Sequence, residues 1–203
     1  GCRAVCLGIA SGRMNHGAEA TETRSFNWEK TAVAQAQMKR ATLFMEDRRA
    51  FRAVLIDEIE RLLRKAERKG VKLAIRLNGA TDVPWEKAVP GLMESFGTVQ
   101  FYDYTKAPLI ARNAAANYHL TYSLGETQES RKNADEWLAA GRNVAVVFGV
   151  DKHHLPTTWQ GREAINGDLH DMRFLDGAGQ YVALSAKGGA KRDTTGFVIR
   201  EGV

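Results

Sequence analysis

The sharpest chemical signal in the sequence is a pair of cysteines at its start. Cys2 and Cys6 are separated by three residues. Thiolates at this spacing can bind a metal or an iron–sulfur cluster, but a four-iron cluster takes four ligands, so two thiolates do not hold one alone. The sequence begins at Gly1 without an initiator methionine, and we expect a processed form or fragment with a further ligand just upstream. The alternative is a pair of reduced thiols without a metal.

A second signal comes from polar side chains on the predicted strands. Residues 72–78, 99–104 and 118–123 alternate apolar with polar side chains, whereas residues 144–148 are apolar on both faces. Polarity increases toward the carboxyl ends of the strands, where barrel enzymes contact their ligands. We therefore expect a cavity lined by Arg76, Asn78, Asp82, Tyr102, Asp103, Lys106, His119 and Ser123. The alternative is a sheet with one face open to water and no ligand.

The elements that must position these residues follow from hydrophobic spacing. Helices are predicted over 31–46 and, after the cap Asp47, up to Gly70. Strands at 72–78, 99–104, 118–123 and 144–150 alternate with helices at 84–96 and 128–140, which is typical of βαβ units and a parallel sheet. Residues 172–175 and 181–184 predict a terminal hairpin. The fold class is α/β, a partial (β/α) TIM-like barrel with N-terminal helices and a C-terminal β-hairpin.

We expect a single domain over residues 1–203. Its parts are an irregular cysteine-containing start (1–27), helices (28–70), a β/α core (71–150) and a β-rich C-terminal part (151–203).

Other candidate residues are weaker. Asp168, Asp171 and Asp176 could supply oxygen ligands to Mg²⁺, although turn chemistry explains Asp168 and Asp176 equally well. His153 and His154 are adjacent in a predicted loop, where a metal role is the minority interpretation. The tryptophans Trp85 and Trp159 are expected to pack against the barrel rim rather than stack on a substrate.

Composition narrows the class of protein. The longest apolar run, residues 144–148, is far too short for a membrane span. Two cysteines fit a reducing compartment, so we expect a cytoplasmic protein. The net charge of +5 and pI near 9.3 allow an anionic partner without requiring one. The sequence contains no P-loop, dinucleotide fingerprint, HExxH or nucleophile elbow, which leaves hydride transfer and serine hydrolysis without support.

Several segments together resemble the "gene product 88" family of mycobacteriophages and actinobacterial prophages, whose function is not established. They occur in order and cover nearly the whole chain. The segments are residues 76–86 (RLNGATDVPWE), 99–106 (VQFYDYTK), 117–123 (NYHLTYS), 143–148 (NVAVVF), 167–168 (GD) with 171–176 (DMRFLD), and 186–188 (AKG).

That family is in turn similar to phage proteins of the radical S-adenosylmethionine (SAM)-like barrel type. These have an N-terminal cysteine cluster, an Asn-x-x-x-Asp segment ending one strand and a Thr-Lys segment ending the next. In this sequence Cys2, Cys6, Asn78, Asp82, Thr105 and Lys106 occupy such places. The pattern C-x3-C-x2-C would place its third cysteine at position 9, which is Ile9, so the cysteine triad is incomplete.

The resemblance implies a radical SAM-type enzyme with a [4Fe–4S] cluster and SAM. Cys2 and Cys6 would be metal ligands. The catalytic candidates are Asp82, Asp103 and Lys106, and the cofactor-binding candidates are Arg76, Asn78, Tyr102, His119 and Ser123. The substrate would be a small molecule or nucleotide in the cavity, in the cytoplasm of the host cell if a phage encodes the chain.

Two other functions stay open on the sequence. One is a non-catalytic phage protein that binds nucleic acid through Arg and Lys on its helices. The other is a Mg²⁺-dependent nuclease that uses Asp168, Asp171 and Asp176.

Overall fold

The computed structural model describes residues 32–79 and 81–200. These residues fall into two compact units, divided between Leu73 and Ala74. We call residues 32–73 the helical unit and residues 74–200 the sheet unit. Whether the chain behaves as the single domain expected from its sequence stays a prediction.

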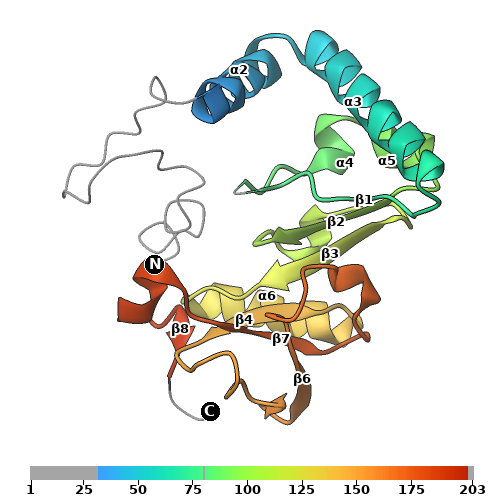
Figure 1. The fold of residues 1–203 in the computed structure, drawn as a ribbon. Coiled ribbons are helices and arrows are strands. Elements are labelled where there is room, and N and C mark those ends of the chain that lie inside the picture. Colours follow the sequence, from blue (N-terminus) through green and yellow to red (C-terminus); the bar gives the residue numbers. More distant parts are fainter. Residues whose placement is uncertain (1–31, 80, 201–203) are drawn as a thin grey trace. The chain divides into compact units, whose positions relative to one another are not determined.

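The helical unit consists of α2 (Ala32–Glu46) and α3 (Arg48–Arg68) (Figure 1). Asp47 separates the two helices, and its carboxylate accepts a hydrogen bond of 2.9 Å from the amide of Ala50. This satisfies one of the free amides at the start of α3, so the predicted cap is confirmed. The rings of Phe44 and Phe51 lie edge to face, 5.0 Å apart, and join the helices. Gly70, at φ +64°, follows the end of α3.

The sheet unit is built on eight strands. They are β1 (Ala74–Ile75), β2 (Gln100–Thr105), β3 (Tyr118–Ser123), β4 (Val144–Phe148), β5 (Thr158–Trp159), β6 (Arg162–Asn166), β7 (Tyr181–Ser185) and β8 (Val198–Ile199). Their order is β1-β2-β3-β4-β7-β6-β5, and β8 also pairs with β4. All pairs are parallel except β5 with β6. This confirms the α/β class, but the sheet is open, with β1 and β5 at the two ends of the described order.

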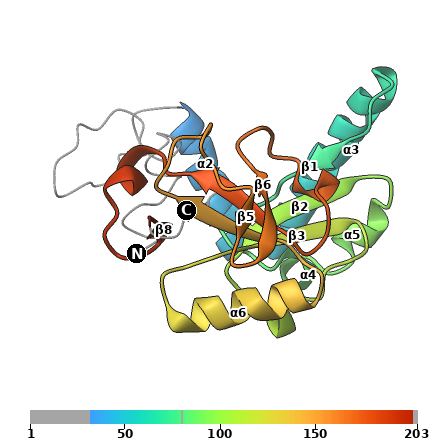
Figure 2. The same cartoon turned by 90° about the horizontal axis from the view of Figure 1, so that it is seen from below.

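Short helices connect the strands. They are α4 (Trp85–Ala88), α5 (Leu92–Ser95) and α6 (Gln128–Ala139), with 3₁₀ turns η2 (Leu109–Ala111), η3 (Arg173–Leu175) and η4 (Gly188–Arg192). The helix predicted over 84–96 is present as α4 and α5, which are interrupted around Pro90 because a proline lacks an amide donor. Figure 2 shows α6 alongside the strands of the sheet.

The predicted C-terminal hairpin is wrong. Residues 173–175 form η3, and β7 lies between β4 and β6 with both pairings parallel. The reason is burial: Val182 and Ala183 are fully covered, which suits a central parallel strand better than a terminal hairpin. Residues 176–179, whose composition is typical of a turn, therefore precede the parallel strand β7 and do not connect the two strands of a hairpin.

The two faces of β2 and β3 have different neighbours. Because side chains alternate along a strand, Phe101, Asp103 and Thr105 share a face with Tyr118, Leu120 and Tyr122. We call this the α6 face, since the ring of Tyr122 lies 5.7 Å from that of Trp137 in α6. Tyr102, Tyr104, His119 and Thr121 occupy the opposite face, here called the η3 face, where the rings of Tyr102 and Phe174 lie 5.4 Å apart.

Candidate functional site

The candidate site is the carboxyl edge of the parallel sheet. In a parallel sheet all strands end at the same edge, and open α/β proteins bind ligands outside it. Lys106 follows β2, and Leu124 follows β3. Asp168 and Lys187 are the second residues after β6 and β7. The sequence thus brings charged residues from distant segments to one edge.

Asp82, in the loop after β1, contacts the carboxyl end of β2. Its carboxylate accepts hydrogen bonds from the amide of Lys106 at 2.7 Å and from the hydroxyl of Thr105 at 3.1 Å. Arg112 donates to the same carboxylate at 3.2 Å and to Thr105 Oγ1 at 2.8 Å. Asp82 therefore joins the loop after β1 to the end of β2, as expected for two segments that meet at one edge.

Arg112 was not identified from the sequence, yet it is central to this network. Its guanidinium is 2% exposed and donates two hydrogen bonds to the Glu86 carboxylate, at 2.6 and 3.0 Å. Burial alone would raise the pKa of Glu86, but the hydrogen bonds and charge of Arg112 outweigh it and lower the pKa. Arg112 lies in the connection between β2 and β3, where no motif or hydrophobic spacing distinguishes it from other arginines in the sequence.

Asp103 lies on the α6 face beneath this edge. Its carboxylate accepts from the Asn78 amide at 2.8 Å and from the Tyr118 hydroxyl at 2.8 Å. Burial raises the pKa of Asp103 to about 6, against the lowering effect of these hydrogen bonds. Its position inside the packed sheet makes it a structural group that orders the end of β1.

Asn78 has the same ordering role. Its side-chain oxygen accepts from the Thr81 hydroxyl at 2.8 Å, the Val83 amide at 3.1 Å and the Trp85 indole at 3.0 Å. The Asn78 side-chain amide donates to the Val83 carbonyl at 3.0 Å. One buried amide therefore holds the turn that carries Asp82. Trp85 is buried within the protein, although the open sheet provides no barrel rim of the kind expected for it.

Lys106 presents its ammonium at the carboxyl end of β3. Its Nζ donates to the main-chain carbonyls of Ser123 at 3.1 Å and Leu124 at 3.3 Å. The same nitrogen lies 5.2 Å from the centre of the Phe197 ring, a favourable cation–π distance. Ser123 contributes its carbonyl here.

A second charged group occupies the edge at β6 and β7. The Asp168 carboxylate, whose side chain is 4% exposed, accepts from Lys187 Nζ at 2.7 Å and from the Ser185 amide at 3.0 Å. The Ser185 hydroxyl also donates to it. Burial raises the pKa of Asp168, and these hydrogen bonds outweigh that and lower it. Lys187 itself is 61% exposed.

The two charged groups are joined by an apolar cluster. Phe197, beneath Lys106, packs against Ala186 and Ala190. Ala186 immediately precedes Lys187. The apolar cluster thus lies beneath the Lys106 ammonium and includes the residue that precedes Lys187.

Arg76, Tyr102 and His119 belong to the η3 face, but Arg76 also reaches the edge network, where its Nε donates to the Asn78 carbonyl at 3.1 Å and lies 4.0 Å from the Asp103 carboxylate. Arg76 contacts Asp171 at 2.8 Å and stacks 4.8 Å from the Tyr104 ring centre, on the η3 face. His119 lies there too, and burial, aided by Arg142 and Arg173, lowers its pKa to about 4. Neighbours such as Tyr102 and Asp103 point to opposite faces of β2, so the eight residues do not share one face of the sheet. Which of them line a ligand site stays a prediction.

The three C-terminal aspartates do not form the expected metal site. Asp168 contacts Lys187, Asp171 contacts Arg76, and Asp176 lies 3.3 Å from Arg173. Within the described ranges, no three histidine, cysteine or acidic side chains come together in a way that could hold a metal ion. His153 and His154 belong to the loop after β4.

Cys2 and Cys6 lie outside the described residues.

Trp159, at the edge of the sheet, packs between Phe148 and Tyr181, with ring centres 5.6 and 4.7 Å away, as predicted. A bilayer-spanning helix, long and apolar throughout, does not occur in the part of the chain that the structure describes.

Comparison with known proteins gives one match. A family model described as gene product 88 matches residues 1–201. No curated protein and no solved structure matches this chain.

Proposed function

We propose that this chain, which belongs to the gene product 88 family of phage proteins, binds an anionic small molecule or nucleotide at the carboxyl edge of its parallel sheet. The observation that carries the proposal is that two lysines follow strands at this edge, Lys106 after β2 with its ammonium over the Phe197 ring and Lys187 after β7 with its ammonium on Asp168. Carboxyl edges of parallel sheets are where α/β proteins bind ligands, and ammonium groups there suit carboxylates or phosphates.

The surrounding contacts support a preorganised site. Carbonyl oxygens at the end of β3 orient the Lys106 ammonium, and Asp82 holds the Lys106 main chain. The buried Asp168 orients Lys187 in the same manner. Each lysine is positioned by a neighbouring strand, so less side-chain entropy is lost when a ligand binds.

As the ligand we propose SAM, together with a [4Fe–4S] cluster. SAM has a carboxylate that Lys106 could bind. The sequence contains two cysteines, Cys2 and Cys6, which supply two of the three thiolates that such a cluster takes. When bound, the cluster and SAM together supply reductive cleavage of a sulfonium carbon–sulfur bond; this chain's own contribution is to bind and orient.

Equilibrium binding of SAM and of ATP to the whole chain tests the edge site. We expect Lys106→Ala to weaken the better ligand roughly 10- to 100-fold, because a hydrogen bond to a charged group contributes about 1.5–3 kcal/mol. Lys132→Ala, an exposed lysine on α6, removes the same charge and should leave the affinity within about twofold. Equal losses in both variants would refute the site.

Anaerobic reconstitution with iron and sulfide tests the cluster. The full-length protein should become brown and hold about four irons. Changing Cys2 and Cys6 together to alanine should abolish both signals while the far-ultraviolet circular dichroism is kept. A colourless, iron-free product with every cysteine intact would end the cluster proposal without affecting the binding of anions at Lys106.

A further inference from the structure

The net positive charge of the chain resides in the helical unit. Residues 32–73 contain 11 Lys and Arg and 6 Asp and Glu, which is a net charge of +5. The rest of the chain contains 18 of each, so it is neutral. Charge gathered in one compact unit, rather than spread over the surface, produces a local positive potential.

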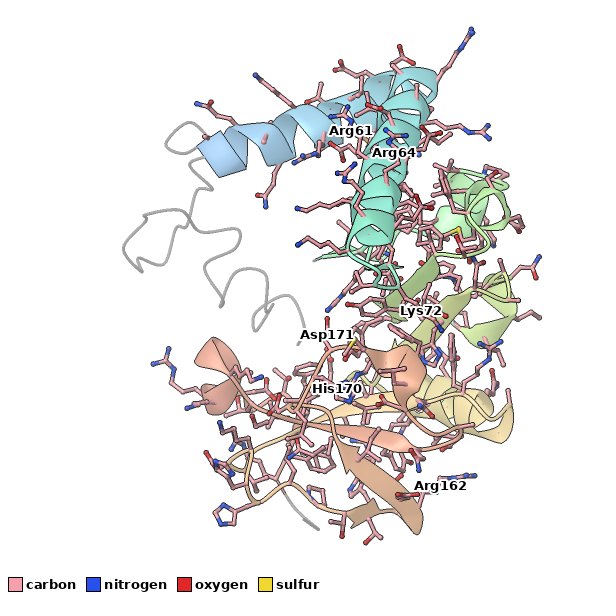
Figure 3. All side chains as sticks on the ribbon, turned by 45° about the vertical axis from the view of Figure 1, so that its right-hand side comes forward. Arg61, Arg64, Lys72, Arg162, His170 and Asp171 are labelled. Carbon is pink, nitrogen blue, oxygen red and sulfur yellow. The ribbon has the colours of Figure 1, made fainter. Side chains whose placement is uncertain are left out.

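Within this unit, four basic residues share one side of α3. Arg61, Arg64, Lys65 and Arg68 recur at positions i, i+3, i+4 and i+7 of the helix, the spacing that places side chains on one face. We call them the α3 basic face. Figure 3 shows Arg61 and Arg64 on adjacent turns. At about 1.5 Å of rise per residue the face is roughly 10 Å long, which spans about three phosphates of one DNA strand.

Local carboxylates do not cancel this face. Asp57 pairs with Arg61, and Glu60 lies 3.5 Å from Arg64, each four residues upstream. All four side chains are about half exposed or more, and exposed pairs of this kind contribute little to stability. For Lys65 and Arg68, the described residues include no ion-pair partner. The guanidinium and ammonium groups can therefore turn to an external anion.

The face suits a nucleic acid better than a membrane. Between Arg61 and Arg68, Leu63 and Ala66 fall on the other side of the helix. Leu62, which is 45% exposed, is the one apolar side chain beside this stretch of the basic face. A helix that lies in a membrane interface needs apolar side chains beside its basic ones.

We infer that the α3 basic face binds the phosphate backbone of a nucleic acid, without reading its sequence. The inference is independent of the carboxyl-edge site, because the basic residues belong to the helical unit and Lys106 and Lys187 belong to the sheet unit. Phosphate contacts fix position without carrying sequence information, so affinity should depend on salt and hardly on sequence.

Fluorescence anisotropy of the whole chain with a labelled 20-base-pair duplex, about two helical turns, tests this. Log affinity should fall with log salt at a slope of about −3 when about three phosphates are neutralised. Changing Lys65 and Arg68 together to alanine should weaken binding about tenfold or more and reduce the slope by about 2. The charge-conserving pair Lys65→Arg with Arg68→Lys should keep the binding, and circular dichroism should show intact helices throughout.

The matched control is Arg131→Ala with Lys132→Ala on α6, which removes two exposed positive charges from the sheet unit. It should leave the slope unchanged. Equal weakening in the control, or no salt-sensitive binding at low ionic strength, would overturn the inference. So would binding to vesicles containing phosphatidylserine in the absence of binding to the duplex.

Discussion

At the scale of single residues, buried polar groups at the end of β1 and β2 order the edge rather than face a ligand. Asn78 and Asp103 are 2% and 1% exposed, and both are hydrogen-bonded within the protein. Their amide and carboxylate groups made them candidate site residues. Because these groups are hydrogen-bonded to internal partners, their role is to order the surrounding loop and strand ends. Our proposal therefore assigns ligand contact to Lys106 and Lys187, whose ammonium groups lie at the strand ends.

The raised pKa of Asp103 predicts a specific pH dependence of stability. The carboxyl has a pKa of about 6 in the folded protein against an ordinary value of 3.8, so between these values the folded state binds more protons than the unfolded state. This group therefore costs stability as pH rises from about 4 to 6, by up to roughly 3 kcal/mol. Asp103→Asn removes the effect.

Urea unfolding of Asp103→Asn and the parent at pH 4, 5, 6 and 7 measures this directly. Relative to the parent, the variant should gain free energy of unfolding as pH rises across that window, with no further gain above pH 7. A difference that stays flat over the whole range would show that Asp103 titrates normally. Other titrating groups cancel in the comparison because both proteins share them.

At the scale of elements, the end of β6 must pass close to β7. A Cβ built on Gly167 would contact Val182 Cγ1 and would lie 2.8 Å from Leu184 Cδ2 and 2.9 Å from Arg173 Nη1. These atoms belong to β7 and to the buried arginine of η3, which have little room to move. The glycine thus allows Asp168, the next residue, to reach Ser185.

We therefore expect Gly167→Ala to lower the free energy of unfolding by about 1–3 kcal/mol, the cost of overpacking a core. Gly97→Ala is the control, because a Cβ there meets no described atom within 4 Å, and its effect should be within about 0.5 kcal/mol. Chemical denaturation of both variants measures these changes in the free energy of unfolding. Equal stability of the two would contradict the close packing at Gly167.

The elements themselves were largely predictable from sequence, but their arrangement was not. The Asp47 cap, the Gly70 stop and the alternating strands depend on local spacing, which the sequence displays. The place of β7 between β4 and β6 depends on contacts between distant segments, so residues 172–184 suggested a hairpin. Contacts between distant segments also limited the prediction of the site. Lys106 was predicted from its place at the end of a strand, but its cation–π contact with Phe197 was not.

At the scale of the whole molecule, charge and ligand chemistry are divided between two compact units. The helical unit contains the net positive charge, and the sheet unit contains the carboxyl edge. This division predicts that loss of nucleic-acid binding and loss of small-molecule binding can be separated by mutation. Neutralising Lys65 and Arg68 should leave the affinity of the edge ligand unchanged.

The most direct test of the central claim is the ratio of ligand dissociation constants for Lys106→Ala and Lys132→Ala. If the carboxyl edge is the binding site, this ratio should be about 10 or more for SAM or for ATP. A ratio near 1, with both folded variants binding as the parent does, would show that the ligand binds elsewhere and that Lys106 only supports the end of β3.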